Sequence, residues 1–167
     1  LPPEDLCAQI QPLRQRFDRH VWRWMPHVSL LYPFWAREHF AEARRRLRAA
    51  LAELVAFDAQ LRSVSSFSHG NGRYTLWLSV EPQASLRGLH AVLSAALPGC
   101  VPPGAVLQPH LTVGQASGRA ELDARTAWVD QHWRPTSFVI DHVALLYRDG
   151  EAPFTVVERF ALGLSAA

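Results

Sequence analysis

The pattern of apolar and polar positions divides the chain into segments of helical and of strand character. Helices are predicted where Ala, Leu, Arg and Glu dominate, and the clearest is residues 37–55; the full set is 4–18, 37–55, 84–97 and 119–132. Strands are predicted where β-branched and aromatic residues alternate with polar ones, over residues 25–32, 57–66, 73–80, 109–115, 136–148 and 154–162.

Turn residues join several of these strands into hairpins. His69-Gly70-Asn71-Gly72 separates one pair of strands and Asp149-Gly150 separates another. Helices that alternate with hairpins are typical of an α+β fold with antiparallel sheets rather than a doubly wound parallel sheet. No glycine-rich loop follows a strand and opens a helix, which argues against a P-loop or a dinucleotide-cofactor site.

Length and composition indicate one folded domain over residues 1–167. Hydrophobic residues make up 49% of the chain and charged residues 19%, as in an ordinary globular protein. No apolar run reaches membrane-spanning length, and the opening residues lack the pattern of a signal peptide. The first residue is Leu1 rather than Met, so we expect the chain to be a domain of a longer protein.

The charge balance and the two cysteines exclude few classes of protein. The 17 basic residues are all Arg and the net charge is +2, so the charge balance alone does not indicate a nucleic-acid binder. Cys7 and Cys100 lie far apart and form no redox or metal motif, which favours a reducing compartment, cytoplasmic or nuclear. No close-spaced histidine pair suits zinc, so no metal and no cofactor are expected. A monomer is expected.

Two tetrapeptides share one pattern. His27-Val28-Ser29-Leu30 and His110-Leu111-Thr112-Val113 each read histidine, apolar, hydroxyl, apolar, and each follows a proline in a predicted strand. Residues i and i+2 of a strand share a face, so each segment presents an imidazole beside a hydroxyl. None of the other histidines among the eight is followed by Ser or Thr at i+2, which disfavours two unrelated histidines.

Such a pair of motifs supports acid–base chemistry on a phosphodiester. Two imidazoles across a cleft can act as general base and general acid, because histidine titrates near neutral pH. The hydroxyls can donate hydrogen bonds to the phosphoryl oxygens held between them. This mechanism requires no metal, and the residues do not determine which histidine is the acid.

The chain resembles the 2H phosphoesterase superfamily, also called the 2′-5′ RNA ligase-like family. The resemblance covers nearly the whole chain and rests on Leu1-Pro2-Pro3 before a helix, the segment 23–34 around the first motif, the strand 74–78, Pro109-His110-Leu111-Thr112-Val113-Gly114, and the closing Phe160-Ala161-Leu162-Gly163. A narrower resemblance, to zinc-finger proteins of the vertebrate leukocyte receptor cluster, rests only on length, the Arg-rich sequence and the missing Met.

The family resemblance implies two pseudo-symmetric α+β lobes with antiparallel sheets around a central cleft and helices on the outside. It implies that His27 and His110 are catalytic and that Ser29 and Thr112 bind phosphate. The substrates implied are RNA ends with a 2′,3′-cyclic phosphate, 2′-5′-linked oligonucleotides, or small cyclic nucleotides. The family usually opens with a strand that this sequence lacks near Leu1, so an edge of the first lobe would be exposed or completed by a neighbouring molecule.

Further residues are candidates for substrate contact. Tyr32 and Phe34 follow the first motif and could stack on a base, although strict alternation favours core packing for Tyr32. Arg148 ends a predicted strand and could reach a phosphate or form a surface ion pair. Gly114 is expected on the motif face, where a ligand would approach closely.

The sequence therefore favours a metal-independent phosphodiesterase acting on RNA ends, short oligonucleotides or cyclic nucleotides. The alternative is an RNA- or nucleotide-binding module that keeps the cleft without useful turnover. Both motifs are complete, which favours the enzyme. RNA ligation through an adenylated lysine is excluded because the chain has no Lys.

Overall fold

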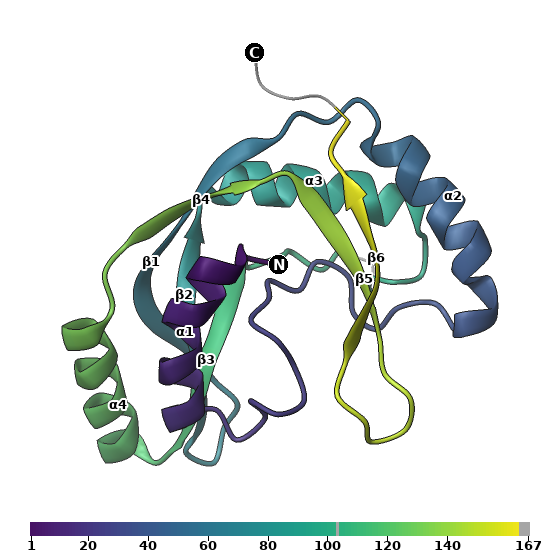
Figure 1. Ribbon diagram of the computed structural model, residues 1–167. Coiled ribbons are helices and arrows are strands. Elements are labelled where there is room, and N and C mark those ends of the chain that lie inside the picture. The colour runs from purple at the N-terminus through teal and green to yellow at the C-terminus, as the bar shows by residue number, and fades with distance from the viewer. Residues whose placement is uncertain (103, 164–167) are drawn as a thin grey trace.

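The computed structural model describes residues 1–102 and 104–163 (Figure 1). Along the described chain the elements are α1 (Glu4–Phe17), a 3₁₀ turn (Arg37–His39), α2 (Phe40–Leu51), β1 (Phe57–Ser68), β2 (Arg73–Glu81), α3 (Gln83–Ala96), β3 (His110–Ser117), α4 (Arg119–His132), β4 (Thr136–Ile140), β5 (His142–Tyr147) and β6 (Thr155–Ala161).

The strands form two antiparallel sheets, which confirms the α+β prediction. One sheet has the order β3-β2-β1-β4, so β3, the strand of the second histidine motif, lies at its edge. The other is the β5–β6 hairpin. The sheets have four and two strands, so the described strands alone do not repeat the predicted pseudo-symmetry of two lobes.

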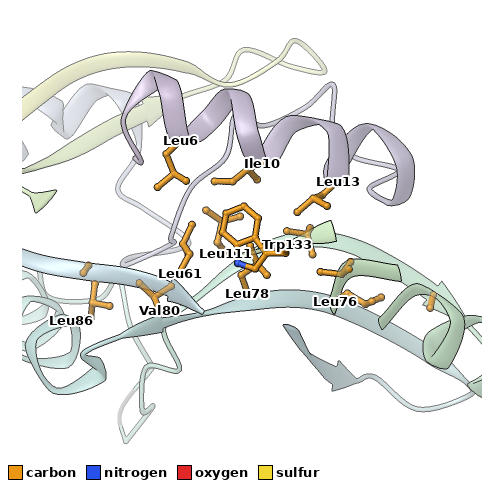
Figure 2. Close-up of a cluster of buried hydrophobic side chains, with 14 of the residues drawn as sticks. Leu6, Ile10, Leu13, Leu61, Leu76, Leu78, Val80, Leu86, Leu111 and Trp133 are labelled. Carbon is orange, nitrogen blue, oxygen red and sulfur yellow. The ribbon is translucent and has the colours of Figure 1, made fainter. Parts of the chain in front are cut away.

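A first core lies between the four-stranded sheet and helices α1 and α4. The spacing of Leu6, Ile10 and Leu13 places all three on one face of α1, against sheet residues such as Leu78 and Leu111 (Figure 2). Each of these side chains is at most 3% exposed, and full burial of such a side chain contributes about 1.5–3 kcal/mol. This core fixes the position of β3.

A second core joins helices α2 and α3 to the β5–β6 hairpin. Phe40 and Leu47 of α2 pack with Leu89 and Leu93 of α3 and with Val143 of β5. In Figure 1 the loop between α1 and α2, which carries the first histidine motif, runs between the four-stranded sheet and this hairpin. The loop therefore lies between the two sheets.

The prediction of a strand over residues 25–32 was wrong. This segment makes a single antiparallel bridge, between Val28 and Leu111 of β3, and is otherwise irregular. A strand needs continuous backbone partners. On the side away from β3 the segment faces a groove of about 380 Å³ that also runs along β5. The groove separates the segment from β5, so no ladder forms there.

The prediction of one strand over residues 136–148 was also wrong. The segment divides at Asp141, where β4 ends its pairing with β1 and β5 begins its pairing with β6. The backbone carbonyl of Asp141 accepts a hydrogen bond from Leu162 at this crossing. The apolar pattern continues through the break because both halves are partly buried, each against a different core.

Gly114 does not lie where a ligand approaches. A β-bulge follows Thr112, since Trp77 pairs with Thr112 while the adjacent Leu76 pairs with Gly114. The bulge turns Gly114 to the α1 side of the sheet. A Cβ atom there would lie 2.5 Å from Cβ of Phe17, so the glycine allows the end of α1 to pack on β3.

Candidate active site

The Val28–Leu111 bridge brings the two histidine motifs together. In an antiparallel bridge the paired side chains share a face, and the residues on either side of them point to the opposite face. His27 is therefore opposite Thr112, and Ser29 is opposite His110. His27 and His110 are diagonal neighbours across this bridge, a relation that sets Cα atoms about 7–8 Å apart in a regular ladder.

Both imidazoles are held in the same way. Nδ1 of His27 is 2.8 Å from the carbonyl oxygen of Met25, and Nδ1 of His110 is 2.7 Å from that of Gln108. A carbonyl only accepts, so in each ring Nδ1–H donates and Nε2 is left to exchange a proton. Each partner lies two residues before its histidine, on the other side of a buried proline.

The prolines explain why this contact occurs twice. A proline restricts the residue before it to extended conformations. Met25 precedes Pro26 and Gln108 precedes Pro109, so each X-Pro-His turn presents a carbonyl to the imidazole that follows. The tetrapeptide pattern predicted the paired imidazoles and hydroxyls, and the preceding proline was the available signal for how the rings are oriented.

The surroundings lower the pKa of both histidines. Burial is the main cause for His27, and the positive charges of Arg14, of the amino terminus and of His110 act in the same direction, against the hydrogen bond to Met25, which raises the pKa. Burial also lowers the pKa of His110, and the hydrogen bond to Gln108 partly offsets it. Both rings therefore favour the neutral form more than a free imidazole does.

Aromatic side chains pack against both imidazoles. Trp24 stacks on His27 with ring centroids 4.9 Å apart, and its other contacts include Phe154 at 3.9 Å. The backbone N–H of Phe154 donates to the carbonyl of Arg23, so the loop between β5 and β6 is tied to this segment. Phe67 meets His110 edge to face at 4.9 Å. The sequence alone did not associate Phe67 or Phe154 with the site, because they come from distant segments.

The other predicted contacts lie around the groove. His27, Ser29, Tyr32, Phe34 and Arg148 all line it, whereas His110 and Thr112 are not among the described residues of its wall. Tyr32 is 62% exposed, so the preference for core packing was wrong; the irregular backbone after Val28 breaks the alternation on which it relied.

Phe34 and Arg148 already have partners within the chain. Phe34 packs against the second core and meets Phe40 edge to face. The guanidinium of Arg148 lies over Phe154 and 3.4 Å from a carboxylate oxygen of Glu151. Because that carboxylate is well exposed and the pair is long, a phosphate could displace it.

Among the described residues, no group of three or more His, Cys, Asp and Glu side chains is placed to hold a metal ion. No helix in the described part of the chain combines the length and the apolar character needed to cross a membrane.

The fold is α+β with antiparallel sheets, and one bridge, between Val28 and Leu111, joins the two histidine motifs. Residues 2–152 match the model of the 2′-5′ RNA ligase superfamily, and the chain belongs to that superfamily. A protein of Geobacillus kaustophilus, named as a candidate phosphoesterase, is 30% identical to this chain over 97% of this chain and 92% of its own length. A similarly named protein of Halalkalibacterium halodurans is 26% identical over 97% of this chain and 94% of its own.

Solved structures show the same fold. The complex of E. coli LigT with 3′-AMP aligns with a TM-score of 0.67 at 16% identity, covering 98% of this chain and 95% of LigT. The complex of LigT with NADP⁺ gives 0.68 at 17% identity over the same shares. The relatives named here are bacterial and give no support to the narrower resemblance to vertebrate zinc-finger proteins.

Proposed function

We propose that this protein is a phosphodiesterase that acts on 2′,3′-cyclic phosphates or 2′-5′-linked oligonucleotides by two-histidine acid–base catalysis, without a metal. The observation that carries the proposal is the matched geometry of His27 and His110. Each donates Nδ1–H to a carbonyl two residues earlier, and the Val28–Leu111 bridge sets each imidazole opposite the other motif's hydroxyl.

In the proposed reaction on a cyclic phosphate, water attacks phosphorus in line with the 3′ oxygen. Nε2 of one neutral histidine takes a proton from the water as the new P–O bond forms. The P–O3′ bond breaks, and the other histidine, protonated, gives its proton to the 3′ oxygen. The product carries a 2′-phosphate and a 3′-hydroxyl, and the two histidines have exchanged protonation states.

Ser29 and Thr112 would bind the non-bridging oxygens. Each hydroxyl lies two residues after one histidine and opposite the other, so both border the space between the rings. The non-bridging oxygens gain charge as the five-coordinate phosphorus forms, so donors fixed beside them stabilise the transition state more than the ground state. Ser29 is exposed and needs no rearrangement to meet a ligand.

The groove is proposed to take the nucleoside part of the substrate. Tyr32 offers an exposed ring near His27, and stacking of a base on an aromatic ring contributes about 1–3 kcal/mol. Arg148 would meet a further phosphate. Nucleotides are the ligands in the named LigT complexes, and the Usb1 protein of Kluyveromyces marxianus, with a TM-score of 0.52, was solved with uridine monophosphate.

A substrate panel tests the proposal. The protein is incubated with 2′,3′-cyclic nucleotides, cyclic-phosphate-ended RNA and 2′-5′ oligoadenylate, and products are identified by phosphorus NMR. We expect turnover of at least one member and a 2′-phosphate from the cyclic nucleotides. A 3′-phosphate would reverse the assumed orientation of the ribose. Tight binding without turnover of any member would show that the protein is not an enzyme for these substrates and would favour the alternative, a nucleotide-binding module.

A further inference from the structure

The backbone before each histidine is fixed by an arginine from a helix, in the same way on both sides of the site. Nη1 of Arg14 in α1 donates to the carbonyl of Trp24 at 2.8 Å, and Nε of Arg87 in α3 donates to the carbonyl of Leu107 at 3.0 Å. Trp24 and Leu107 each lie three residues before a histidine of the pair. The two arginines belong to different helices and to no motif that the proposed reaction uses.

The likeness extends to the arginines' own neighbours. Arg14 lies 3.5 Å from the side-chain oxygen of Gln11, three residues earlier on α1. Arg87 donates to the side-chain oxygen of Gln83, four residues earlier on α3, at 2.6 Å. In both cases a glutamine one helical turn back helps to hold the guanidinium toward the turn before the histidine.

We infer that Arg14 and Arg87 are positioning residues that hold the two X-Pro-His turns, and through them the directions of the His27 and His110 rings. The inference rests on the proposed function of those histidines. Each arginine fixes the peptide that leads into the carbonyl of Met25 or Gln108, and that carbonyl fixes Nδ1 of the ring. A reacting group misplaced by about 1 Å can cost 10²-fold in rate.

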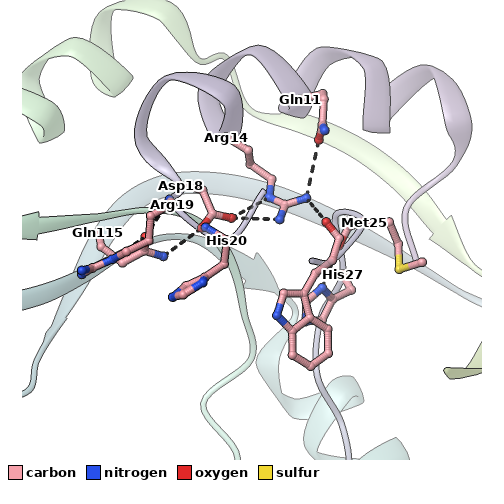
Figure 3. Close-up of polar contacts among 9 residues, drawn as sticks. Gln11, Arg14, Asp18, Arg19, His20, Met25, His27 and Gln115 are labelled. Atoms are coloured by element: carbon pink, nitrogen blue, oxygen red, sulfur yellow. Dashed lines mark hydrogen bonds and ion pairs between the residues drawn. The ribbon is translucent and has the colours of Figure 1, made fainter. Parts of the chain in front are cut away.

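The Arg14 side of this arrangement is buried and fully paired. Nε and Nη2 of Arg14 both contact Oδ2 of Asp18, at 3.1 and 2.8 Å, and each side chain is 3% exposed (Figure 3). Oδ1 of Asp18 accepts from the backbone of His20 and from the side chain of Gln115. Gln115 lies on β3, the strand of His110, so this network ties the His27 segment to the strand of the other histidine.

A buried ion pair adds little net stability, because desolvation of both charges offsets their attraction. The contacts that the Arg14–Asp18 pair makes show a more specific role. Arg14 binds the carbonyl of Trp24, and the indole of Trp24 stacks on the His27 ring, so the pair helps to hold that ring. Arg87 has no such buried partner and is exposed, so the two positioning residues can be tested by different variants.

Arg87 gives the cleaner test because its exposed side chain can be changed without disturbing a core. Arg87→Gln should lower kcat about tenfold with little change in KM, and Arg87→Lys, which keeps a donor and the charge, should recover part of the loss. Arg119→Gln is the matched control, since Arg119 is an exposed helical arginine that pairs with Asp123. A rise in KM with unchanged kcat would show instead that Arg87 binds substrate, and would overturn the inference.

A readout that needs no activity separates this inference from the proposed function. In nitrogen NMR of the ligand-free protein, Arg87→Gln should change the tautomer signals of His110 and leave those of His27 unchanged. Arg14→Gln, which removes the donor to the carbonyl of Trp24 and leaves the Asp18–Gln115 contact in place, should do the reverse. If each variant alters both rings alike, or neither, the inference fails even if the enzyme is active. If each variant changes the signals of only its own histidine and no member of the substrate panel is turned over, only the proposed function fails.

Discussion

Replacing either His27 or His110 by alanine is expected to lower kcat on the best substrate of the panel by about 10²–10⁴-fold, the usual contribution of a positioned acid or base. Each ring leaves only Nε2 free to exchange a proton, because Nδ1–H is held by a backbone carbonyl. No other described histidine shares this arrangement with a hydroxyl two residues on. Steady-state kinetics of the purified variants measures the effect.

The pair should behave as a unit. The double variant is expected to be little slower than either single variant, since a reaction that has lost its base gains little from an acid. His132→Ala is the matched control, because His132 is exposed at the end of α4 and stacks on Trp128 outside the site. If a single variant folds correctly and keeps the wild-type rate, the replaced histidine takes no part in the reaction.

Loss of the hydroxyls should have the next largest effect. Thr112→Val and Ser29→Ala are each expected to lower kcat by up to about 10²-fold, less than the histidine changes. The hydroxyl bonds strengthen as charge gathers on the non-bridging oxygens, so kcat should fall more than KM rises. Thr112→Ser keeps the donor and should retain most of the activity.

Comparison of the valine and serine variants isolates the hydroxyl from the shape of the side chain. Thr112 pairs with Trp77 across the sheet, so Thr112→Val preserves the packing volume while it removes the hydrogen bond. If Thr112→Val and Thr112→Ser lose activity to the same extent, packing rather than phosphate contact explains the effect, and the proposed role of Thr112 is wrong.

The sequence predicted most elements because their signals are local. Helix α4 begins and ends at the predicted residues, Arg119 and His132, and strands β1, β2 and β6 lie within two residues of their predicted bounds. The predictions failed where the outcome depends on distant partners. Residues 25–32 have the composition of a strand but only one bridging partner, and residues 136–148 contribute to two sheets.

The site shows the same division between local and distant information. The spacing of His27 with Ser29, and of His110 with Thr112, is local information, and it led to the prediction that each imidazole shares a face with a hydroxyl. The residues that orient them were not predictable in this way. Arg14 and Arg87 act on carbonyls 10 and 20 residues away, and Phe67 reaches His110 from another strand. Such contacts are fixed only by the packing of the helices on the two cores.

The pH dependence of kcat/KM, measured with a strong chelator present, tests the central claim most directly. Activity should rise as the general base loses its proton and fall as the general acid loses its own, which gives a bell-shaped profile. Burial lowers the pKa of both His27 and His110, so the maximum should lie on the acidic side of about 6.5, the ordinary histidine value. Activity that disappears with the chelator and returns with a divalent metal, or a profile without both limbs, would contradict the two-histidine mechanism.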